Sequence, residues 1–431
     1  MISFSARAPR MFTADEALSL VHSGQRVYIG GGCGVPSPLL DALVARAPTL
    51  RNVEINHMLT AGDDPTAAPE HSESFRHNAL FIGSNVRRAV NEGRADFTPV
   101  FLSEIPRLFR SGRLPLDVAM LQVAPPDQHG FCSLGVEVGC TLPAAQIART
   151  VIAEINTQMP RTLGDSFIHI SRITACVETD RPLHELPQGD SNPVAEQIGQ
   201  YIADLIPDGA TMQLGIGAIP DAVLRYLSHK RHLGIHTELF SDGIIDLVEA
   251  GVIDGEAKTL GRGKLVAGFL LGTRRLFDWV HNNAMVDLHP TDYINDPFVI
   301  AQHKRMVAIN SALQVDLTGQ VCADSIGTRL YSGAGGQVDF IRGAARSEEG
   351  VPIIALPATA QGGRLSRIVP TLDPGAGVVT SRYDVHYVIT ECGVAQLHGK
   401  TLSQRARALI AIAHPDFRDS LTAAAREMHY L

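Results

Sequence analysis

Short apolar segments alternate with segments of helical periodicity along most of this chain. Four segments rich in β-branched and apolar residues are expected to form strands, namely residues 27–29, 53–55, 79–82 and 118–121. Two segments have the spacing of buried helix faces, residues 37–47 and 193–205. Such alternation is typical of proteins in which helices cover both faces of parallel strands. The sequence therefore predicts an α/β fold with mostly parallel sheets.

One local pattern occurs twice. A strand, a glycine turn, a proline and an apolar helix follow one another around Gly31 and Pro36, and again around Gly215 and Pro220. The glycine-to-proline spacing is the same in both copies. A repeated unit of this kind predicts two similar open α/β domains, one in each half of the chain. Chance similarity between two glycine turns is the alternative explanation.

The segment between the two copies, residues 181–193, is rich in turn-forming residues and is a candidate linker. We therefore place the boundary near residue 188, with domains over residues 1–188 and 189–431. A chain of 431 residues with 45% apolar and 19% charged residues has ample material for two or three such cores.

Charge and cysteine content narrow the function classes. The chain has 37 Lys and Arg against 45 Asp and Glu, a net charge of −8, which argues against a dedicated nucleic-acid-binding protein. This net charge is still compatible with a local basic pocket for an anionic ligand. No uncharged apolar run approaches the ~18 residues of a membrane span. The six cysteines are scattered without zinc-type grouping, and the start lacks a secretory signal, so we expect a cytoplasmic protein without a metal.

The turn over residues 215–220 is a candidate ligand site. Gly215 and Gly217 allow a ligand close to the backbone, and Pro220 suits the first turn of a helix. The exposed N–H groups of such a turn can bind a phosphate or a developing oxyanion. The alternative is a tight turn that needs glycine only for packing. A dinucleotide fingerprint is disfavoured, because Pro220 stands in place of its third glycine.

Glu238 is the candidate reactive group. Ile235, Thr237 and Leu239 alternate with polar residues, which predicts a strand with Glu238 near its carboxyl end. Ligands of open α/β sheets bind outside the carboxyl ends of strands, and a carboxylate among apolar residues becomes a better nucleophile or base. The alternative is a structural glutamate paired with an arginine or with backbone N–H groups. The corresponding strand of the first half, near His57, carries no acid.

A third glycine cluster contains Gly333, Gly335 and Gly336 within four residues. It predicts either an anion-binding nest or a flexible surface turn. Val338 and Phe340 directly after it indicate that the loop is anchored to the core, which a mere linker would not need.

Together these segments resemble the acetyl-CoA hydrolase/transferase family, the class I carboxylate CoA-transferases. Each matching segment is weak alone, but their order along essentially the whole chain is specific. They lie at residues 99–106, 125–135, 213–221, 237–243, 310–316, 332–340, 378–391 and 410–418. Within the family, the resemblance is greatest to the enzymes that act on butyrate and 4-hydroxybutyrate.

The resemblance implies two domains of the same type and assigns the nucleophile to Glu238. It also implies a turn that binds the oxyanion and CoA, formed by Gly215, Ile216, Gly217, Ala218 and Ile219. Further contacts with CoA are implied at Ala312, Gly333, Gly335 and Gly336. Family members often carry a lysine where this chain has Gln361. We therefore expect Arg364 or another residue to supply the missing cation.

The implied activity is transfer of CoA between a short-chain acyl-CoA and a carboxylate such as acetate, butyrate or 4-hydroxybutyrate, through a glutamyl-CoA thioester. No metal and no cofactor beyond the substrate CoA is implied, nor any nucleic-acid or membrane partner, and the family expectation is a homodimer or dimer-based oligomer. Three alternatives stay open. An acyl-CoA hydrolase on the same fold would use water as the acceptor. A non-catalytic acyl-CoA-binding subunit is opposed by the retained Glu238. A sugar-phosphate isomerase or deaminase of related fold would not need the late glycine loop.

Overall fold

The computed structural model describes residues 11–189 and 192–431, which divide into two compact units. The first unit consists of the residues up to Pro187 together with Val266–Ile294, and the second of Gln188–Leu265 and Asn295–Leu431. We predicted a single boundary near residue 188. The structure instead has further boundaries, because residues 266–294 belong to the first unit although they lie between the two segments of the second.

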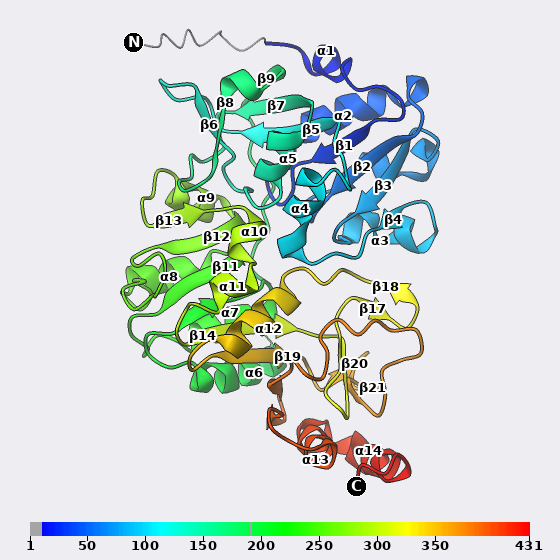
Figure 1. The fold of residues 1–431 in the computed structure, drawn as a ribbon, viewed down its shortest axis with the longest axis vertical. Coiled ribbons are helices and arrows are strands. Elements are labelled where there is room, and N and C mark those ends of the chain that lie inside the picture. Colours follow the sequence, from blue (N-terminus) through cyan, green and yellow to red (C-terminus); the bar gives the residue numbers. More distant parts are fainter. Residues whose placement is uncertain (1–10, 190–191) are drawn as a thin grey trace. The chain divides into compact units, whose positions relative to one another are not determined.

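A seven-stranded sheet organises the first unit (Figure 1). Its strand order is β4-β3-β2-β1-β5-β7-β9, and all its neighbouring strands are parallel. The order runs outward from β1 in both directions, as in doubly wound α/β folds. The strands are β1 Arg26–Ile29, β2 Val53–His57, β3 Phe75–Ala79, β4 Asp96–Phe97, β5 Val118–Val123, β7 Thr150–Asn156 and β9 Ala175–Thr179.

Short helices and a small antiparallel strand pair complete this unit. Thr13 and Glu16 form a capping box at the start of the first helix, because each side chain accepts a hydrogen bond from the other residue's backbone N–H. The helices are α1 Ala14–Leu18, α2 Ser37–Ala45, α3 Ser84–Asn91, α4 Ile105–Arg110, α5 Thr141–Ile147, α9 Arg274–Val280 and α10 Thr291–Ile294. The remaining strands are the antiparallel pair β6 Phe131–Ser133 and β8 Phe167–His169, with β12 Leu265–Leu270 starting at the boundary and β13 Val286–Leu288.

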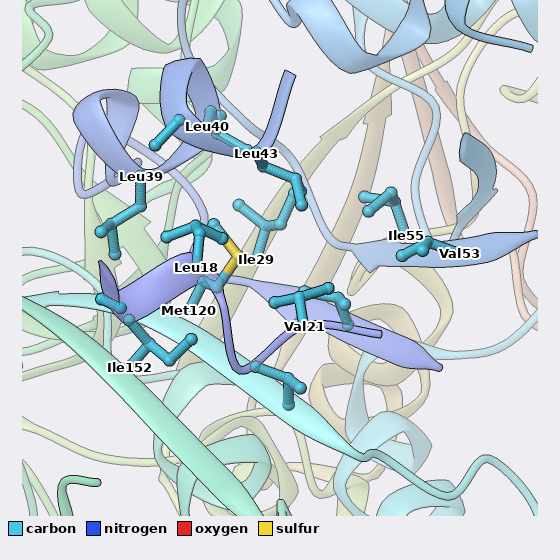
Figure 2. Packing of buried hydrophobic residues seen from close by; sticks show 14 of the residues in the cluster. Leu18, Val21, Ile29, Leu39, Leu40, Leu43, Val53, Ile55, Met120 and Ile152 are labelled. Atoms are coloured by element: carbon cyan, nitrogen blue, oxygen red, sulfur yellow. The ribbon is translucent and has the colours of Figure 1, made fainter. Parts of the chain in front are cut away.

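The hydrophobic core of the first unit lies between helix α2 and the sheet (Figure 2). Leu39 and Leu43 are one helical turn apart, so they share the face of α2 that is turned to the strands. They belong to one buried cluster with Ile29, Ile55 and Met120 of β1, β2 and β5. Each such side chain contributes about 1.5–3 kcal/mol by leaving water, which holds the glycine turn after β1 in place.

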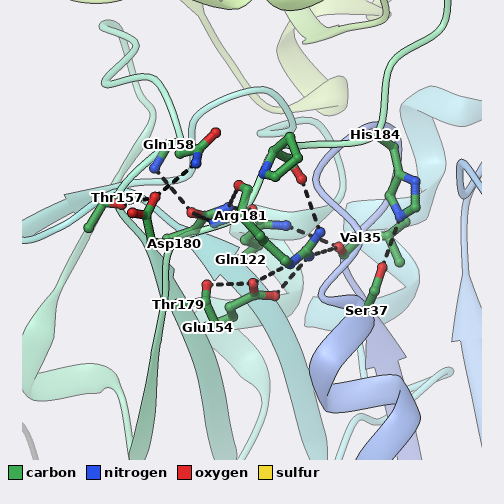
Figure 3. A network of polar contacts seen from close by, with 12 residues as sticks. Val35, Ser37, Gln122, Glu154, Thr157, Gln158, Thr179, Asp180, Arg181 and His184 are labelled. Atoms are coloured by element: carbon green, nitrogen blue, oxygen red, sulfur yellow. Dashed lines mark hydrogen bonds and ion pairs between the residues drawn. The ribbon is translucent and has the colours of Figure 1, made fainter.

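A buried ion pair ties the carboxyl ends of β7 and β9 together (Figure 3). The side chain of Glu154 is fully buried, and its two oxygens accept hydrogen bonds from Nε and Nη2 of Arg181 at 2.7 and 3.0 Å. Thr179 Oγ1 donates to the same carboxylate at 2.7 Å. Arg181 Nη2 also donates to the carbonyl oxygen of Val35 at 2.8 Å. The guanidinium of Arg181, in the loop after β9, therefore contacts both strand β7 and the loop after β1.

Replacing Arg181 with leucine is expected to lower the free energy of unfolding of this unit by about 3–5 kcal/mol, because it leaves the Glu154 carboxylate buried without its cation. Urea unfolding followed by circular dichroism measures the change. The double variant Arg181→Leu/Glu154→Leu should recover most of the loss. If Arg181→Leu were as stable as the wild type, the ion pair between Arg181 and Glu154 would not contribute to the stability of this unit.

The main strands of the second unit follow the order β11-β10-β14-β19-β23-β24. All their neighbours are parallel except the last pair, which is antiparallel. The strands are β10 Thr211–Gln213, β11 Gly234–Phe240, β14 Met306–Ser311, β19 Val351–Ala355, β23 Tyr387–Thr390 and β24 Gly393–Gln396.

Helices, a small three-stranded sheet and two short antiparallel strand pairs complete this unit (Figure 1). The helices are α6 Pro193–Leu205, α7 Ala218–Arg225, α8 Gly243–Glu249, α11 Pro297–Ile300, α12 Gln337–Arg346, α13 Leu402–Ile412 and α14 Pro415–Glu427. The short strands are β15 Gln314–Asp316, β16 Val321–Cys322, β17 Ser325–Ile326, β18 Arg329–Leu330, β20 Thr359–Ala360, β21 Leu365–Ser366 and β22 Ile368–Val369. None of the helices among the described residues is long and apolar enough to cross a membrane.

The predicted α/β class with mostly parallel sheets is confirmed. One predicted strand is misplaced, because residues 79–82 follow the strand β3 Phe75–Ala79 instead of forming one. The reason is that β3 buries polar side chains. His77 and Asn78 are almost fully buried, and the Asn78 side chain donates to Asn56 Oδ1 at 3.0 Å and accepts from Thr98 Oγ1 at 2.7 Å. Internal pairing of this kind makes a buried strand look like a surface loop in the sequence.

Candidate active site

The turn after β10 leads directly into helix α7 and leaves the start of that helix open. Gly217 has φ +106° and ψ −176°, a backbone conformation that is essentially restricted to glycine. It occupies the N-cap position, and no side chain of the described residues caps the helix. The first backbone N–H groups of α7 therefore remain available to an anion or an oxyanion.

Two buried side chains fix this turn against the neighbouring strands. Gln213 Oε1 accepts hydrogen bonds from the N–H of Ile309 at 3.1 Å and from Asn310 Nδ2 at 3.0 Å, which ties β10 to β14. Thr237 Oγ1 donates to the carbonyl oxygen of Leu214 at 3.0 Å, which ties the turn to β11. The turn is therefore held on both sides by the sheet.

A cavity of about 200 Å³ adjoins the turn. Its wall combines the predicted turn residues with the ends of two other strands of the second unit. The lining residues are Asn192, Ala195, Ile216, Ala218, Ile219, Pro220, Ser311 and Pro357. The cavity lies at the carboxyl ends of β10, β14 and β19, the edge at which open α/β sheets bind their ligands.

Glu238 stands on β11, the strand next to β10. It is the one residue of β11 that is not fully buried. Its Oε2 accepts a hydrogen bond from Asn295 Nδ2 at 3.3 Å, and the carboxylate also accepts one from the backbone N–H of Gly336. Neither partner carries a charge, so the carboxylate is held by neutral donors and pairs with no arginine among the residues that the structure describes.

Burial raises the pKa of the Glu238 carboxyl to about 7, and the hydrogen bonds from Asn295 and Gly336 oppose that shift. Desolvation disfavours the charged form of a carboxyl, whereas donors to its oxygens favour it. Near pH 7 this carboxylate is therefore both present and poorly solvated, which makes it more nucleophilic than a surface glutamate.

Gly336 approaches the Glu238 carboxylate so closely that no side chain fits between them. A Cβ added to Gly336 would overlap with Glu238 Oε2 and with Asn295 Nδ2. Its φ of −93° is ordinary, so the contact alone demands glycine here. The predicted glycine loop and the predicted reactive carboxylate thus meet in one place.

The other candidate residues belong to the same unit. Gly333 and Gly335 lie in the same loop before α12, and of these three glycines Gly336 is the one that contacts Glu238. Ala312 follows β14 directly and is nearly buried. Gln361 is exposed and its carbonyl oxygen accepts from Nε of Arg364, which is also exposed.

Asn295 was not found from the sequence. It precedes Asp296, whose side chain caps α11, so the pair has the appearance of an ordinary helix start. The structure buries Asn295 completely and turns its amide to the carboxylate of a residue 57 positions earlier. Its Oδ1 has no hydrogen-bond partner among the described residues.

With this geometry established, comparison with known proteins identifies the family. Residues 6–187 match the acetyl-CoA hydrolase/transferase N-terminal domain, and residues 272–425 match the C-terminal domain of the same name. The chain belongs to the acetyl-CoA hydrolase/transferase family. This confirms the resemblance seen in the sequence.

Members of this family resemble the chain over nearly its full length. The 4-hydroxybutyrate coenzyme A transferase of Clostridium kluyveri is 54% identical, with 96% of each chain covered. The butyryl-CoA:acetate CoA-transferase of Anaerostipes caccae is 37% identical, covering 96% of this chain and 95% of the relative. The crystal structure of RipA from Yersinia pestis has a TM-score of 0.93 at 37% identity, with 98% of both chains covered.

The two transferases named above are more similar to this chain than a named hydrolase of the family. The acetyl-CoA hydrolase of Kluyveromyces lactis is 25% identical, against 37–54% for the two transferases above. The comparisons therefore favour a transferase over a hydrolase.

Proposed function

We propose that this protein transfers CoA between a short-chain acyl-CoA and a carboxylate, with Glu238 as the nucleophile. The observation that carries the proposal is the Glu238 carboxylate, desolvated and held by two neutral donors beside the open turn of α7. Acetate, butyrate and 4-hydroxybutyrate are the proposed acceptors, because similar relatives are named for them.

In the first half-reaction, the Glu238 carboxylate attacks the thioester carbonyl of acyl-CoA. The C–S bond breaks, and the products are an acyl–glutamyl anhydride and CoA thiolate. The thiolate then attacks the glutamyl carbonyl, releasing the free carboxylate and leaving a glutamyl-CoA thioester. An acceptor carboxylate reverses both steps, so that a new acyl-CoA leaves and the Glu238 carboxylate is restored.

Two sets of donors match the two carbonyls that react. The open N–H groups at the start of α7 are suited to the acyl oxygen of the substrate. Asn295 Nδ2 already donates to Glu238 Oε2, and the Gly336 N–H donates to the same carboxylate, so both are suited to the oxygen that becomes negative when thiolate attacks the glutamyl carbonyl. Removing one donor of this kind typically costs about 10²–10³-fold in rate.

Transfer requires that water stay away from the anhydride and the thioester, since hydrolysis of either would waste the acyl-CoA. Glu238 lies between fully buried strand residues, which supports such exclusion. A homodimer and a cytoplasmic location stay predictions from the resemblance and the sequence.

An acceptor screen tests the proposed function. The protein is incubated with butyryl-CoA and with acetate, 4-hydroxybutyrate, succinate or buffer alone, and the acyl-CoA products are separated by chromatography. We expect new acyl-CoA with a carboxylate acceptor and little free CoA in buffer. Free CoA released at the same rate in all samples, without any new acyl-CoA, would favour a hydrolase.

A further inference from the structure

Gln337 is the first residue of α12 and directly follows Gly336, whose N–H contacts the Glu238 carboxylate. The side chain of Gln337 is polar but almost fully buried. Both ends of its amide are engaged, since Nε2 donates to the carbonyl oxygen of Ser311 at 2.6 Å and Oε1 accepts from Thr380 Oγ1 at 2.9 Å. A buried amide is costly unless it is hydrogen-bonded, so these two contacts fix where the side chain lies.

The two partners of Gln337 belong to well-fixed parts of the second unit. Ser311 is the last residue of β14 and lines the cavity at the α7 turn. Thr380 is fully buried, and its carbonyl oxygen accepts the N–H of Val321 on β16 at 3.0 Å. A backbone carbonyl can only accept a hydrogen bond, so the amide nitrogen must face Ser311, and the hydroxyl of Thr380 must donate to the amide oxygen. The Gln337 side chain therefore bridges the end of β14 and a segment paired with β16.

The loop before Gln337 has few restraints of its own. Three of the four residues from 333 to 336 are glycines without side chains that could pack, and Gly335 has φ +54°, which glycine adopts easily. Before the glycines, the loop is attached at Ser332, whose N–H and hydroxyl both donate to backbone carbonyl oxygens. After the glycines, the first side chain that can hold the loop is that of Gln337. The position of the Gly336 N–H therefore depends on this anchor.

The same anchor relates the two sets of donors that the reaction uses. Gln213 ties β10, the strand before the α7 turn, to Ile309 and Asn310 of β14. Gln337 ties the glycine loop to Ser311, the next residue of β14. Both sets of donors are thus attached to the carboxyl end of one strand. Preorganised donors must be held within about 0.5 Å of their working positions, which requires rigid supports of this kind.

We propose that Gln337 is a positioning residue, which holds the Gly336 N–H against the Glu238 carboxylate through its two buried hydrogen bonds. This inference rests on the proposed function, because it concerns the nucleophile of that reaction. Gln337 acts through Gly336 and not on the substrate. Loss of its hydrogen bonds lets the loop move away from the carboxylate, which weakens one donor to the glutamyl oxyanion.

The variant Gln337→Met tests this role, because methionine keeps the length of the side chain and removes both hydrogen bonds. We expect kcat for CoA transfer from butyryl-CoA to acetate to fall by about 10- to 100-fold, since displacements of about 1 Å near a reacting group have such effects. KM for butyryl-CoA should change little, because the contacts that bind CoA are not removed.

The pH dependence separates positioning from a loss of stability. The hydrogen bond from Gly336 lowers the pKa of the Glu238 carboxyl, so weakening it should raise the pH at which kcat/KM is half-maximal by about 0.5 to 1 pH unit. This half-maximal pH does not depend on how much of the protein is folded. A merely structural role of Gln337 would therefore leave it unchanged.

Thr380 tests the same contact from its other side. Thr380→Ser keeps the hydroxyl and should retain the kcat and the half-maximal pH of the wild type. Thr380→Val removes the hydroxyl and should change both in the same direction as Gln337→Met. Thr390→Val is the matched control, because Thr390 is equally buried but its Oγ1 donates to the carbonyl oxygen of Ile412 at 2.6 Å. We expect Thr390→Val to lower the thermal midpoint without moving the half-maximal pH.

An unchanged half-maximal pH in Gln337→Met would overturn the inference, and Thr380→Val decides in the same way if Gln337→Met does not fold. An equal upward shift in Thr390→Val would also overturn it, because any lost buried hydroxyl would then have the same effect. Failure of the proposed function is a separate result, since the wild type would then form no new acyl-CoA with any acceptor.

Discussion

Replacing Glu238 with glutamine is expected to lower CoA transfer by about 10⁴-fold or more, because the substitution removes the only group proposed to bond to the substrate. Glutamine keeps the size of the side chain, so the strand β11 should remain intact. Transfer rates with butyryl-CoA and acetate measure the loss, and thermal unfolding confirms that the variant is folded. Glu427→Gln, a change at an exposed glutamate on α14, serves as the control and should retain full activity.

The pH dependence of kcat/KM in the wild type provides a second test of the role of Glu238. Burial raises the pKa of Glu238 to about 7, and only the deprotonated form is a nucleophile. Therefore kcat/KM should fall as the pH drops below about 7 and reach a plateau above it, since this ratio reports ionisation in the free enzyme. An activity that stays constant from pH 5 to pH 8 would contradict the assignment of Glu238.

Replacing Gly336 with alanine is expected to lower transfer by about 100-fold or more. The new methyl group would overlap with Glu238 Oε2 and Asn295 Nδ2, so the carboxylate must rotate away from its donors. Displacements of about 1 Å at a reacting group are enough for such losses. The backbone of Gly336 is ordinary for alanine, so the thermal midpoint should change little.

The double variant separates this displacement from a general defect of the loop. If Gly336→Ala acts by moving Glu238, then Glu238→Gln/Gly336→Ala should be no less active than Glu238→Gln alone, because both changes remove the same step. Multiplicative losses in the double variant would show that Gly336 acts independently of Glu238.

The sequence allowed Glu238 and its glycine turn to be predicted because both are local patterns. Period-two alternation puts Glu238 near the end of a strand, and the glycines at 215 and 217 mark a strand-to-helix turn. The fold class followed from the same periodicities. The family could be inferred only from many weakly similar segments taken together, and the comparisons confirmed it.

Asn295 could not be predicted, because what distinguishes it is its tertiary surroundings. Asn295 reaches Glu238 only after the chain has passed through the first unit and returned. The wrong prediction of strand β3 has a related cause. His77 and Asn78 are buried in β3 because their side chains form hydrogen bonds with Thr66 and Asn56, which come from other segments.

The central claim is that CoA becomes covalently attached to Glu238 during transfer. The most direct measurement is to incubate the protein with butyryl-CoA in the absence of an acceptor, reduce it with borohydride, and map the peptides by mass spectrometry. We expect the glutamate at position 238 to be converted to the corresponding alcohol, and Glu238→Gln to show no change. An unmodified Glu238 in a protein that transfers CoA at full rate, or modification of a different carboxylate, would contradict it.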